Sequence, residues 1–235
     1  MNNFVVYTVI TNGYDNLIEP ETIEEGIDYI CYTDSPKLKS KYWTIRLLPK
    51  WTKNIPKNKR QRILKILPHI LFPEYNKSLY VDANVKIKGN IINMFAKTDG
   101  NIISIRKYPK RNCVYEEAKA VIKSEKDSAN IVSPQIERYK KINFPEDFGL
   151  FETNIIFREH NTEACKKCMG KWALEVMLGS HRDQLSLTYA MWITNTKVVG
   201  LDSELSDSDI FYTDMRHTSK SKRKRKRKKH VFKHI

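Results

Sequence analysis

The sequence predicts an α/β fold in which a mixed, mainly parallel sheet is flanked by helices within a single domain. Two observations support this prediction. Short β-branched runs alternate with amphipathic helical stretches through the first half of the chain, which is the pattern of repeated strand–helix units. The length of 235 residues and a composition with 40% hydrophobic residues suit one globular domain with its own core.

The expected elements follow in chain order. In the first half we expect strands at 4–10, 29–33, 43–48, 79–81 and 102–105, and a helix with an apolar and a basic face at 58–71. In the second half we expect helices at 116–124 and 129–141, the latter interrupted near Pro134, then a buried strand at 153–157 and helices at 162–178 and 184–193. The sequence shows no internal repeat and no boundary between domains.

The net charge of +15 is concentrated at the C-terminal end of the sequence. Lys220 and the unbroken run 222–229 supply nine positive charges, which leaves about +6 for the rest. Such a run repels itself and has nothing apolar to bury, so we expect a folded domain at 1–215 and a disordered basic tail at 216–235. The tail from Lys220 to Lys229 suits contact with a polyanion or an anionic membrane, a nuclear import signal, or simply a solvated end.

No segment is expected to cross a membrane or to act as a secretory leader. No apolar run reaches the roughly 20 residues that span a bilayer, and the N-terminal apolar run is short and lacks a basic flank. We therefore expect a cytoplasmic protein with reduced cysteines. The Cys165–Cys168 spacing suits zinc, but both residues lie on the apolar stripe of an expected helix, so core packing is the better interpretation.

Polar residues that follow the expected strands are the first candidates for chemistry. Ligands of open α/β sheets bind at the carboxyl ends of the strands, an edge that here gathers residues 8–15, 34 and 82–84. Alternation along an extended chain would put Asp82 and Asn84 on one side, an oxygen pair that suits Mg²⁺ or Mn²⁺ against a diphosphate. A local turn, in which Asp and Asn are common, explains the same residues without a ligand.

The basic face of the helix at 58–71 is a second candidate. Its cations either neutralise a pyrophosphate leaving group or form an ordinary solvated face. The cations are Lys59, Arg60, Arg62 and Lys65.

Asp183, between Arg182 and Gln184 at the start of another expected helix, is a third candidate. Helix capping accounts for Asp183 without any function. The functional alternatives are that it orients an acceptor hydroxyl, acts as its base, or stabilises an oxocarbenium-like centre. The neighbouring His181 is interpreted as structural.

Several segments between Val5 and Ile193 form a recognisable set in this order. They are residues 62–69 (RILKILPH), 72–75 (FPEY), 80–85 (YVDANV), 110–118 (KRNCVYEEA), 149–154 (GLFETN), 157–161 (FREHN) and 182–186 (RDQLS). Together they resemble the glycosyltransferase-like (hexosyltransferase) domain, first catalogued as a domain of unknown function, of bacterial polysaccharide and plant mucilage proteins. That family is similar in turn to glycogenin-type enzymes of the GT-A superfamily.

The resemblance implies a GT-A (Rossmann-like) fold, a nucleotide-sugar donor that is usually a UDP-sugar, and a divalent metal, Mn²⁺ or Mg²⁺, at an Asp-x-Asp-like motif. On that footing Asp82 is the leading metal ligand, with Asn84 in the place of the second acid. His217 loosely resembles a C-terminal histidine that completes the metal–diphosphate site in related enzymes.

The same likeness implies roles for further residues. Thr8, Tyr14 and Asp34 would contact the base and the ribose. Arg62 and Lys65 would face the diphosphate. The residues that would line the reaction centre are Glu152, Asn154, Arg182 and Asp183.

We therefore predict a glycosyltransferase that moves a hexose from a nucleotide-sugar to a glycan or another hydroxyl acceptor, with metal assistance, in polysaccharide biosynthesis. The alternative is a catalytically degenerate GT-A domain that binds polyanions through its basic tail, motivated by Asn84 in place of an acid. A nucleotidyltransferase is disfavoured because no Gly-rich phosphate loop follows the first expected strand. The sequence does not fix the sugar, the stereochemical outcome or the oligomeric state.

Overall fold

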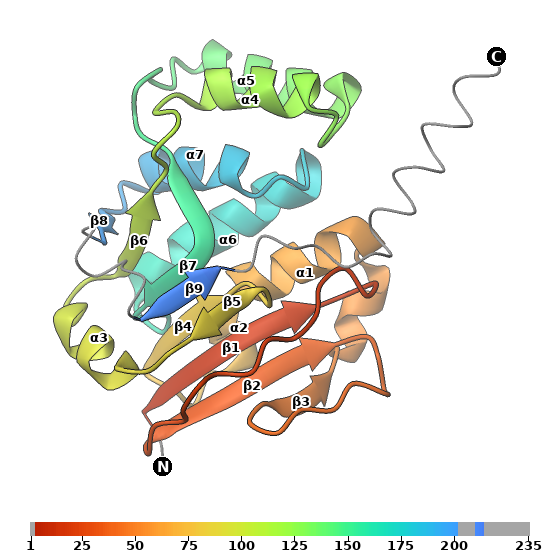
Figure 1. The fold of residues 1–235 in the computed structure, drawn as a ribbon. Coiled ribbons are helices and arrows are strands. Elements are labelled where there is room, and N and C mark those ends of the chain that lie inside the picture. The colour runs from red at the N-terminus through yellow and green to blue at the C-terminus, as the bar shows by residue number, and fades with distance from the viewer. Residues whose placement is uncertain (1–2, 202–209, 214–235) are drawn as a thin grey trace, which may run out of the picture.

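The computed structural model describes residues 3–201 and 210–213, which form a seven-stranded sheet, a two-stranded sheet and their covering helices (Figure 1). The order across the large sheet is β3-β2-β1-β4-β7-β6-β8. Its strands are β1 (Phe4–Ile10), β2 (Ile27–Thr33), β3 (Thr44–Leu47), β4 (Lys77–Val81), β6 (Ile103–Lys107), β7 (Phe151–Arg158) and β8 (Val199–Gly200). Only β7 runs against the other strands of this sheet, which confirms the predicted mixed, mainly parallel sheet.

Strands β1, β2 and β4 are buried because they are largely apolar, whereas the edge strand β3 is partly exposed. Val6 of β1 pairs with Tyr29 of β2 on one side and with Leu79 of β4 on the other. Along β1, Tyr7 and Val9 belong to one core and Val6 belongs to the opposite core. Strands of this kind are typical of parallel sheets that are covered on both sides.

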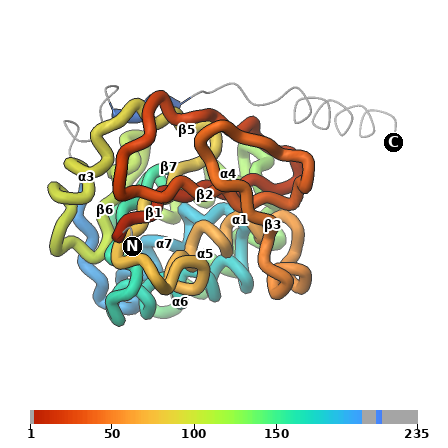
Figure 2. Tube along the Cα trace, turned by 90° about the horizontal axis from the view of Figure 1, so that it is seen from below, coloured from red at the N-terminus to blue at the C-terminus, as the bar shows by residue number. Residues whose placement is uncertain are grey.

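Helices and the small sheet cover the two faces (Figure 2). One face packs against α1 (Lys57–Ile66), α2 (Pro68–Leu71), α6 (Glu163–Leu178) and α7 (Gln184–Thr194). The other packs against α3 (Ile91–Lys97) and the two-stranded sheet of β5 (Val85–Ile87) and β9 (Phe211–Thr213). A short 3₁₀ helix, η1 (Lys50–Asn54), precedes α1.

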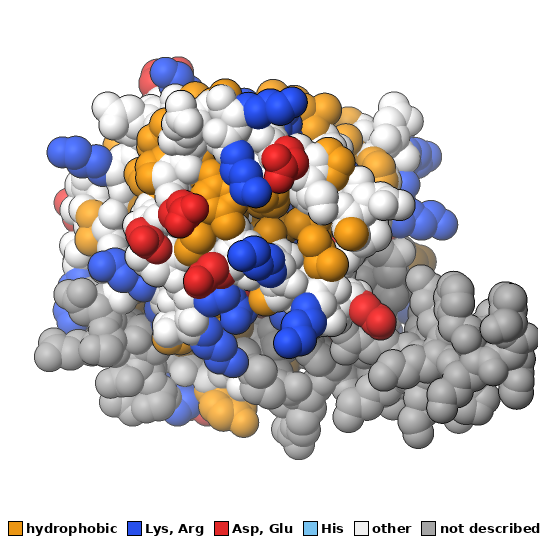
Figure 3. Space-filling view, turned by 90° about the horizontal axis from the view of Figure 1, so that it is seen from above, with side chains coloured by type: hydrophobic (Ala, Val, Ile, Leu, Met, Phe, Trp, Pro, Cys, Tyr) orange, Lys and Arg blue, Asp and Glu red, His pale blue; other side chains and the backbone are white. Residues whose placement is uncertain are grey.

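A third core lies outside the sheet, where α4 (Val114–Lys123) and α5 (Ala129–Lys141) pack on α7. The buried carboxylate of Glu175 ties α5 to α6, because Arg138 donates to both of its oxygens at 3.1 and 2.9 Å. The face seen from above in Figure 3, over α4 and α5, carries interspersed cationic and anionic side chains around apolar patches.

The two predicted helices that contain a proline behave differently from expectation. The helix predicted at 58–71 breaks at Leu67, because the residue before Pro68 is driven out of the helical region, and α2 begins at the proline. By contrast α5 runs unbroken through Pro134, so the predicted interruption is wrong. Pro134 lies on the exposed side of α5, where water can bond the carbonyl that loses its helical partner.

Burial settles the role expected for two cysteines. Cys165 and Cys168 are fully buried in the core against the sheet, which confirms packing as their role.

The short elements β5, α3, β8 and β9 were not predicted, because each offers too few residues for a clear periodic pattern. None of the described helices combines the length and apolar character that a membrane crossing requires. The predicted tail at 216–235 lies outside the described residues.

Candidate active site

The topology creates a crevice at one edge of the sheet. The chain passes from β1 outward to β2 and β3, and β4 then returns to the other side of β1, so the loops that follow β1 and β4 diverge. Ligands of open α/β sheets bind at such a switch point, outside the carboxyl ends of the strands.

The loop after β1 is a tight turn at this edge. Asn12 and Gly13 have φ of 59° and 57°, and the N–H of Tyr14 donates to the carbonyl of Thr11 at 3.2 Å, as in a type I′ turn. The Asp34 carboxylate, which follows β2, accepts the N–H of Asn12 at 2.8 Å. The structure therefore places Tyr14 and Asp34 together at the predicted edge.

The antiparallel strand β7 adds the residues at its beginning to the same edge. Val81 at the end of β4 pairs with Ile155, and the N–H of Asp82 donates to the carbonyl of Asn154 at 2.8 Å. A strand that runs the other way starts where its parallel neighbours end. Glu152 and Asn154 consequently lie beside Asp82, although 70 and 72 residues separate them in sequence.

A pocket of about 300 Å³ opens among these elements. It is lined by Asp82, Tyr108, Glu152, Thr153, Asn154, Arg182, Asp183 and Gln184. Five of the residues predicted for the metal site and the reaction centre are in this set. Its volume is at the lower end of the about 300–1,000 Å³ that ligand sites have.

Asp82 begins a turn, and this corrects the predicted relation to Asn84. The carbonyl of Asp82 accepts the N–H of Val85 at 2.8 Å, so the chain turns between them and strand alternation does not apply. Asn84 does not line the pocket with Asp82. The amide of Asn154 does line it, and its Oδ1 is buried with no hydrogen-bond partner among the described residues.

Two side chains hold one oxygen of Asp82. The hydroxyl of Tyr80 donates to Oδ1 at 2.7 Å, and the ammonium of Lys65 lies 3.9 Å from the same atom. Burial and the charge of Asp82 raise the pKa of Tyr80 well above its ordinary value, so the phenol remains a donor. The Asp82 side chain is 30% exposed, and within the described chain Oδ2 accepts no hydrogen bond.

Asp183 is a buried counter-charge and not a helix cap. It occupies the N-cap position of α7 but makes no capping bond. Its side chain is 5% exposed, and Lys65 lies 2.7 Å from Oδ2 and Arg62 lies 3.6 Å from Oδ1. Thr153 also donates to Oδ2 at 3.2 Å, while the buried indole of Trp172 fixes the Asp183 carbonyl at 2.8 Å.

Electrostatics keep this carboxylate ionised. Burial alone would raise the pKa of Asp183, but the charges of Lys65, Arg62 and Arg182 and the bond from Lys65 lower it well below its usual range. Burial lowers the pKa of Lys65, although Asp183 and Asp82 oppose this effect. An acid held in this way cannot take up a proton near pH 7, so Asp183 is unsuited to act as a general base.

Arg182 is the uncommitted cation of the pocket. It forms no ion pair and no side-chain hydrogen bond with any described residue, and its Nε is buried without a partner. Buried polar groups are nearly always bonded, so an orphaned guanidinium nitrogen at a pocket wall suits an anionic ligand.

The predicted basic face of α1 divides in two. Arg62 and Lys65 pair with Asp183 of the pocket but do not line it themselves, and Lys65 is fully buried instead of solvated. Lys59 donates instead to the carbonyls of Met177 and Gly179, both at 2.8 Å, and Arg60 donates to carbonyls before the helix. The latter two cations therefore anchor backbone.

Of the remaining predicted residues, one lines the pocket, one is buried in a strand and one lies outside the described residues. Glu152 lines it and pairs with Arg106 at 3.6 Å. Thr8 is fully buried in β1, and its hydroxyl has no partner in the described part of the chain, so no ligand reaches it in this conformation. His217 lies outside the described residues.

Sequence reasoning missed Tyr80 and Thr153 as supports of the two carboxylates. Both residues lie on strands, Tyr80 on β4 and Thr153 on β7. Tyr80 stands two residues before Asp82, which strand alternation places on the same face. Nothing local in the sequence links Thr153 to Asp183.

Comparison with known proteins gives a family and two similar structures. A family model described as the TOD1/MUCI70 glycosyltransferase-like domain matches residues 1–211. Comparison with curated proteins gave no match. Apo mouse xyloside xylosyltransferase 1 is similar with a TM-score of 0.49 and 12% identity, over 85% of this chain and 85% of that chain. The apo WbbM bifunctional glycosyltransferase has a TM-score of 0.49 and 11% identity, over 85% of this chain and 38% of that chain.

Proposed function

The chain belongs to the TOD1/MUCI70 glycosyltransferase-like domain family, and from this premise we propose that it moves a hexose from a UDP-sugar to a hydroxyl of a glycan acceptor. One observation carries the proposal. At the carboxyl edge of the sheet, the pocket that contains Asp82 and Asp183 is walled by Arg182, a cation that forms no ion pair with any described carboxylate.

The charges of the pocket suit a diphosphate. Asp183 holds Lys65 and Arg62 in place, and Arg182 adds a charge with a planar set of donors that fits phosphate oxygens. Fixed cations of this kind stabilise negative charge as it develops on a leaving group. In the proposed donor that group is the diphosphate of UDP.

The proposed transfer exchanges one bond at the anomeric carbon. The acceptor oxygen forms a bond to that carbon, the bond from carbon to the diphosphate oxygen breaks, and UDP leaves with the electron pair. The proton of the acceptor hydroxyl must pass to a base. Asp183 is poorly suited to be that base, because Lys65 and Arg62 lower the pKa of its carboxyl group well below the usual range and so make it a weak base; its proposed role is to hold the cations and the pocket wall.

The donor set fits a Mg²⁺ or Mn²⁺ ion that takes most of its ligands from substrate and water. Asp82 would hold it through Oδ2, and Asn154 through Oδ1, which is buried in this conformation and would have to turn toward the pocket. Among the described residues, no group of three or more His, Cys, Asp or Glu is placed to hold a metal. Ions bound through one or two protein oxygens and substrate phosphates are common for Mg²⁺. When bound, the metal would offset the charge of the diphosphate.

His217 remains a predicted third ligand, and it lies outside the described residues.

The nucleoside is proposed to lie over the loop after β1. Tyr14 and Asp34 flank that loop, and Tyr14 lies near Arg62, which pairs with Asp183 of the pocket. Thr8 would take part only if the edge opens, since its side chain is fully buried.

A thermal-shift panel of nucleotide-sugars with and without Mn²⁺ tests the proposal. A donor present at 100 times its Kd stabilises the folded protein by about 2.7 kcal/mol, and UDP release measures turnover. We expect one UDP-sugar to raise the Tm in a Mn²⁺-dependent way. Arg182→Ala should remove most of this shift, and Lys119→Ala, which removes an exposed charge on α4, should not.

The opposite result favours the alternative. If no nucleotide-sugar stabilises or is turned over by the full chain, while heparin binds it in a salt-dependent way, the protein acts as a polyanion-binding domain.

A further inference from the structure

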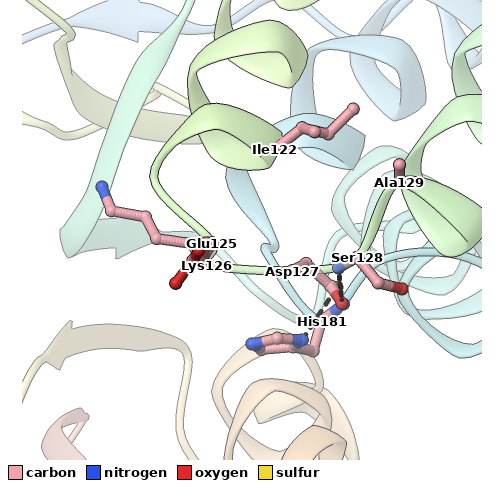
Figure 4. Close-up of a pocket in the computed structure, with 7 residues that line it drawn as sticks. All are labelled: Ile122, Glu125, Lys126, Asp127, Ser128, Ala129 and His181. Carbon is pink, nitrogen blue, oxygen red and sulfur yellow. Dashed lines mark hydrogen bonds and ion pairs between the residues drawn. The ribbon is translucent and has the colours of Figure 1, made fainter. Parts of the chain in front are cut away.

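A second pocket, of about 570 Å³, lies between the connection of α4 to α5 and the loop that precedes α7 (Figure 4). Glu125, Asp127 and Ser128 line it from the first segment and His181 lines it from the second. It is larger than the Asp82 pocket, and no step of the proposed transfer has used it.

An oriented carboxylate–imidazole pair forms the polar wall of this pocket. Asp127 Oδ2 accepts the hydroxyl of Ser180 at 2.6 Å and the N–H of His181 at 3.2 Å, and Oδ1 accepts the N–H of Ser128 at 2.8 Å. The Nδ1 atom of His181 lies 2.8 Å from Oδ2, off the direction of a good hydrogen bond, so this contact is mainly electrostatic.

Charge and burial define the state of both groups. Burial alone would raise the pKa of Asp127, but the bonds from Ser180 and Ser128 and the nearby His181 lower it. Burial lowers the pKa of His181, although Asp127 opposes this effect. The pair is therefore an ionised carboxylate beside a neutral imidazole, and the proton on Nδ1 leaves Nε2 as an acceptor.

The loop that carries His181 is held rigidly. The N–H of Ser180 donates to Gln135 Oε1 at 2.8 Å, and Lys59 donates to the carbonyl of Gly179 at 2.8 Å. A Cβ at Gly179 would lie 2.3 Å from Gln135 Oε1, so only glycine fits there without a shift. The imidazole is thus presented by a fixed backbone, as binding sites require.

One loop, residues 181–183, contributes side chains to both pockets. Arg62 bears on the pKa of His181 and also pairs with Asp183 at 3.6 Å, and His181 is followed directly by Arg182 and Asp183. A molecule in the second pocket would therefore contact the same loop that walls the proposed donor site.

We infer that the Asp127–His181 pocket binds the saccharide of the acceptor, with Nε2 of His181 accepting a hydrogen bond from one of its hydroxyls. This inference rests on the proposed function. A carboxylate, an imidazole and the apolar side chain of Ile122 suit a sugar, which presents both hydroxyls and C–H surfaces.

The test compares acceptor and donor kinetics with p-nitrophenyl glycosides of glucose, galactose, xylose and N-acetylglucosamine as probes. We expect His181→Ala and Asp127→Asn to raise the KM for the glycoside at least tenfold more than the KM for the UDP-sugar. Glu137→Gln, which removes an exposed charge on α5 outside the pocket, should change neither KM.

An NMR measurement on the wild-type protein tests the inference even if the substituted proteins fold poorly. In ¹³C-histidine-labelled wild-type protein, a glycoside should shift the Cε1–H signal of His181, assigned by its loss in His181→Gln. Equal changes of the two KM values, or a His181 signal that no glycoside moves, would overturn the inference. If the wild-type protein turns over no UDP-sugar at all, the proposed function fails as well. If it turns over a UDP-sugar but either result above is obtained, only the acceptor pocket is ruled out.

Discussion

The pocket holds two carboxylates in opposite circumstances. Asp82 directly follows strand β4 and is 30% exposed, and only its Oδ1 accepts a hydrogen bond from a described residue. Asp183 begins a helix, is 5% exposed and is surrounded by Lys65, Arg62 and Thr153. The first has an oxygen that accepts no hydrogen bond from a described residue, whereas the second is already satisfied by the protein.

The different surroundings of Asp82 and Asp183 imply different roles for the two carboxylates. A carboxylate with an open oxygen can ligate a cation, but one locked between two buried cations serves to hold them. Loss of Asp183 should therefore be felt first in stability, and loss of Asp82 first in transfer.

The largest expected effect is that of Asp183→Ala on folding. Lys65 is 1% exposed and would lose its contact at 2.7 Å, and breaking a buried pair in this way costs about 3–5 kcal/mol. Urea unfolding measures the change. The double variant Lys65→Met with Asp183→Leu should recover much of the loss, because no buried charge is then left alone. A loss below about 1 kcal/mol for Asp183→Ala would break the comparison.

Asp82→Ala should have the next largest effect, and on transfer instead of folding. Removal of a ligand that helps to stabilise the leaving diphosphate is expected to slow UDP release about 100- to 1,000-fold, which corresponds to about 2.7–4 kcal/mol. Because Asp82 is partly exposed, its stability cost should remain below about 1 kcal/mol. Undiminished turnover in Asp82→Ala would contradict the assignment of the pocket.

A substitution that removes only the charge of Asp183 sharpens the comparison further. Asp183→Asn keeps the shape and should reduce kcat/KM about 10- to 100-fold, because Lys65 and Arg62 lose their counter-charge. The lowered pKa keeps Asp183 ionised at every pH above the ordinary value of about 3.9. The pH profile of the variant between pH 5 and 9 should therefore run parallel to that of the wild type. A missing limb in the profile would show instead that Asp183 acts as a base.

The surroundings of Asp82 could be predicted from the sequence better than those of Asp183. An apolar strand that ends in an acid locates Asp82 at the sheet edge, since the end of a parallel strand is a local feature. The buried pair of Lys65 and Asp183 was not accessible in this way. A lysine on an amphipathic helix is expected in solvent, and it is buried only because the α6–α7 connection, more than a hundred residues later, closes over it.

The pairing of segments was the least predictable part of the fold. The reversed direction of β7, which carries Asn154 to Asp82, is a property of the whole sheet and leaves no local signal. β5 and β9 are three-residue strands that stabilise one another across more than a hundred residues. The alternation rule failed at Asn84 because the strand had already ended in a turn.

The smallest expected effect distinguishes the predicted partner of Asp82 from the one that the structure favours. Asn84 does not line the pocket, whereas Asn154 lines it with an orphaned Oδ1. Asn154→Ala should therefore weaken the Mn²⁺-dependent binding of UDP about tenfold, near 1.4 kcal/mol, while Asn84→Asp changes it less than about threefold. Calorimetric titration of UDP at several Mn²⁺ concentrations measures both. A tenfold gain in Asn84→Asp, with Asn154→Ala unchanged, would restore the Asp82–Asn84 pair as the ligand set and show that the turn rearranges when metal binds.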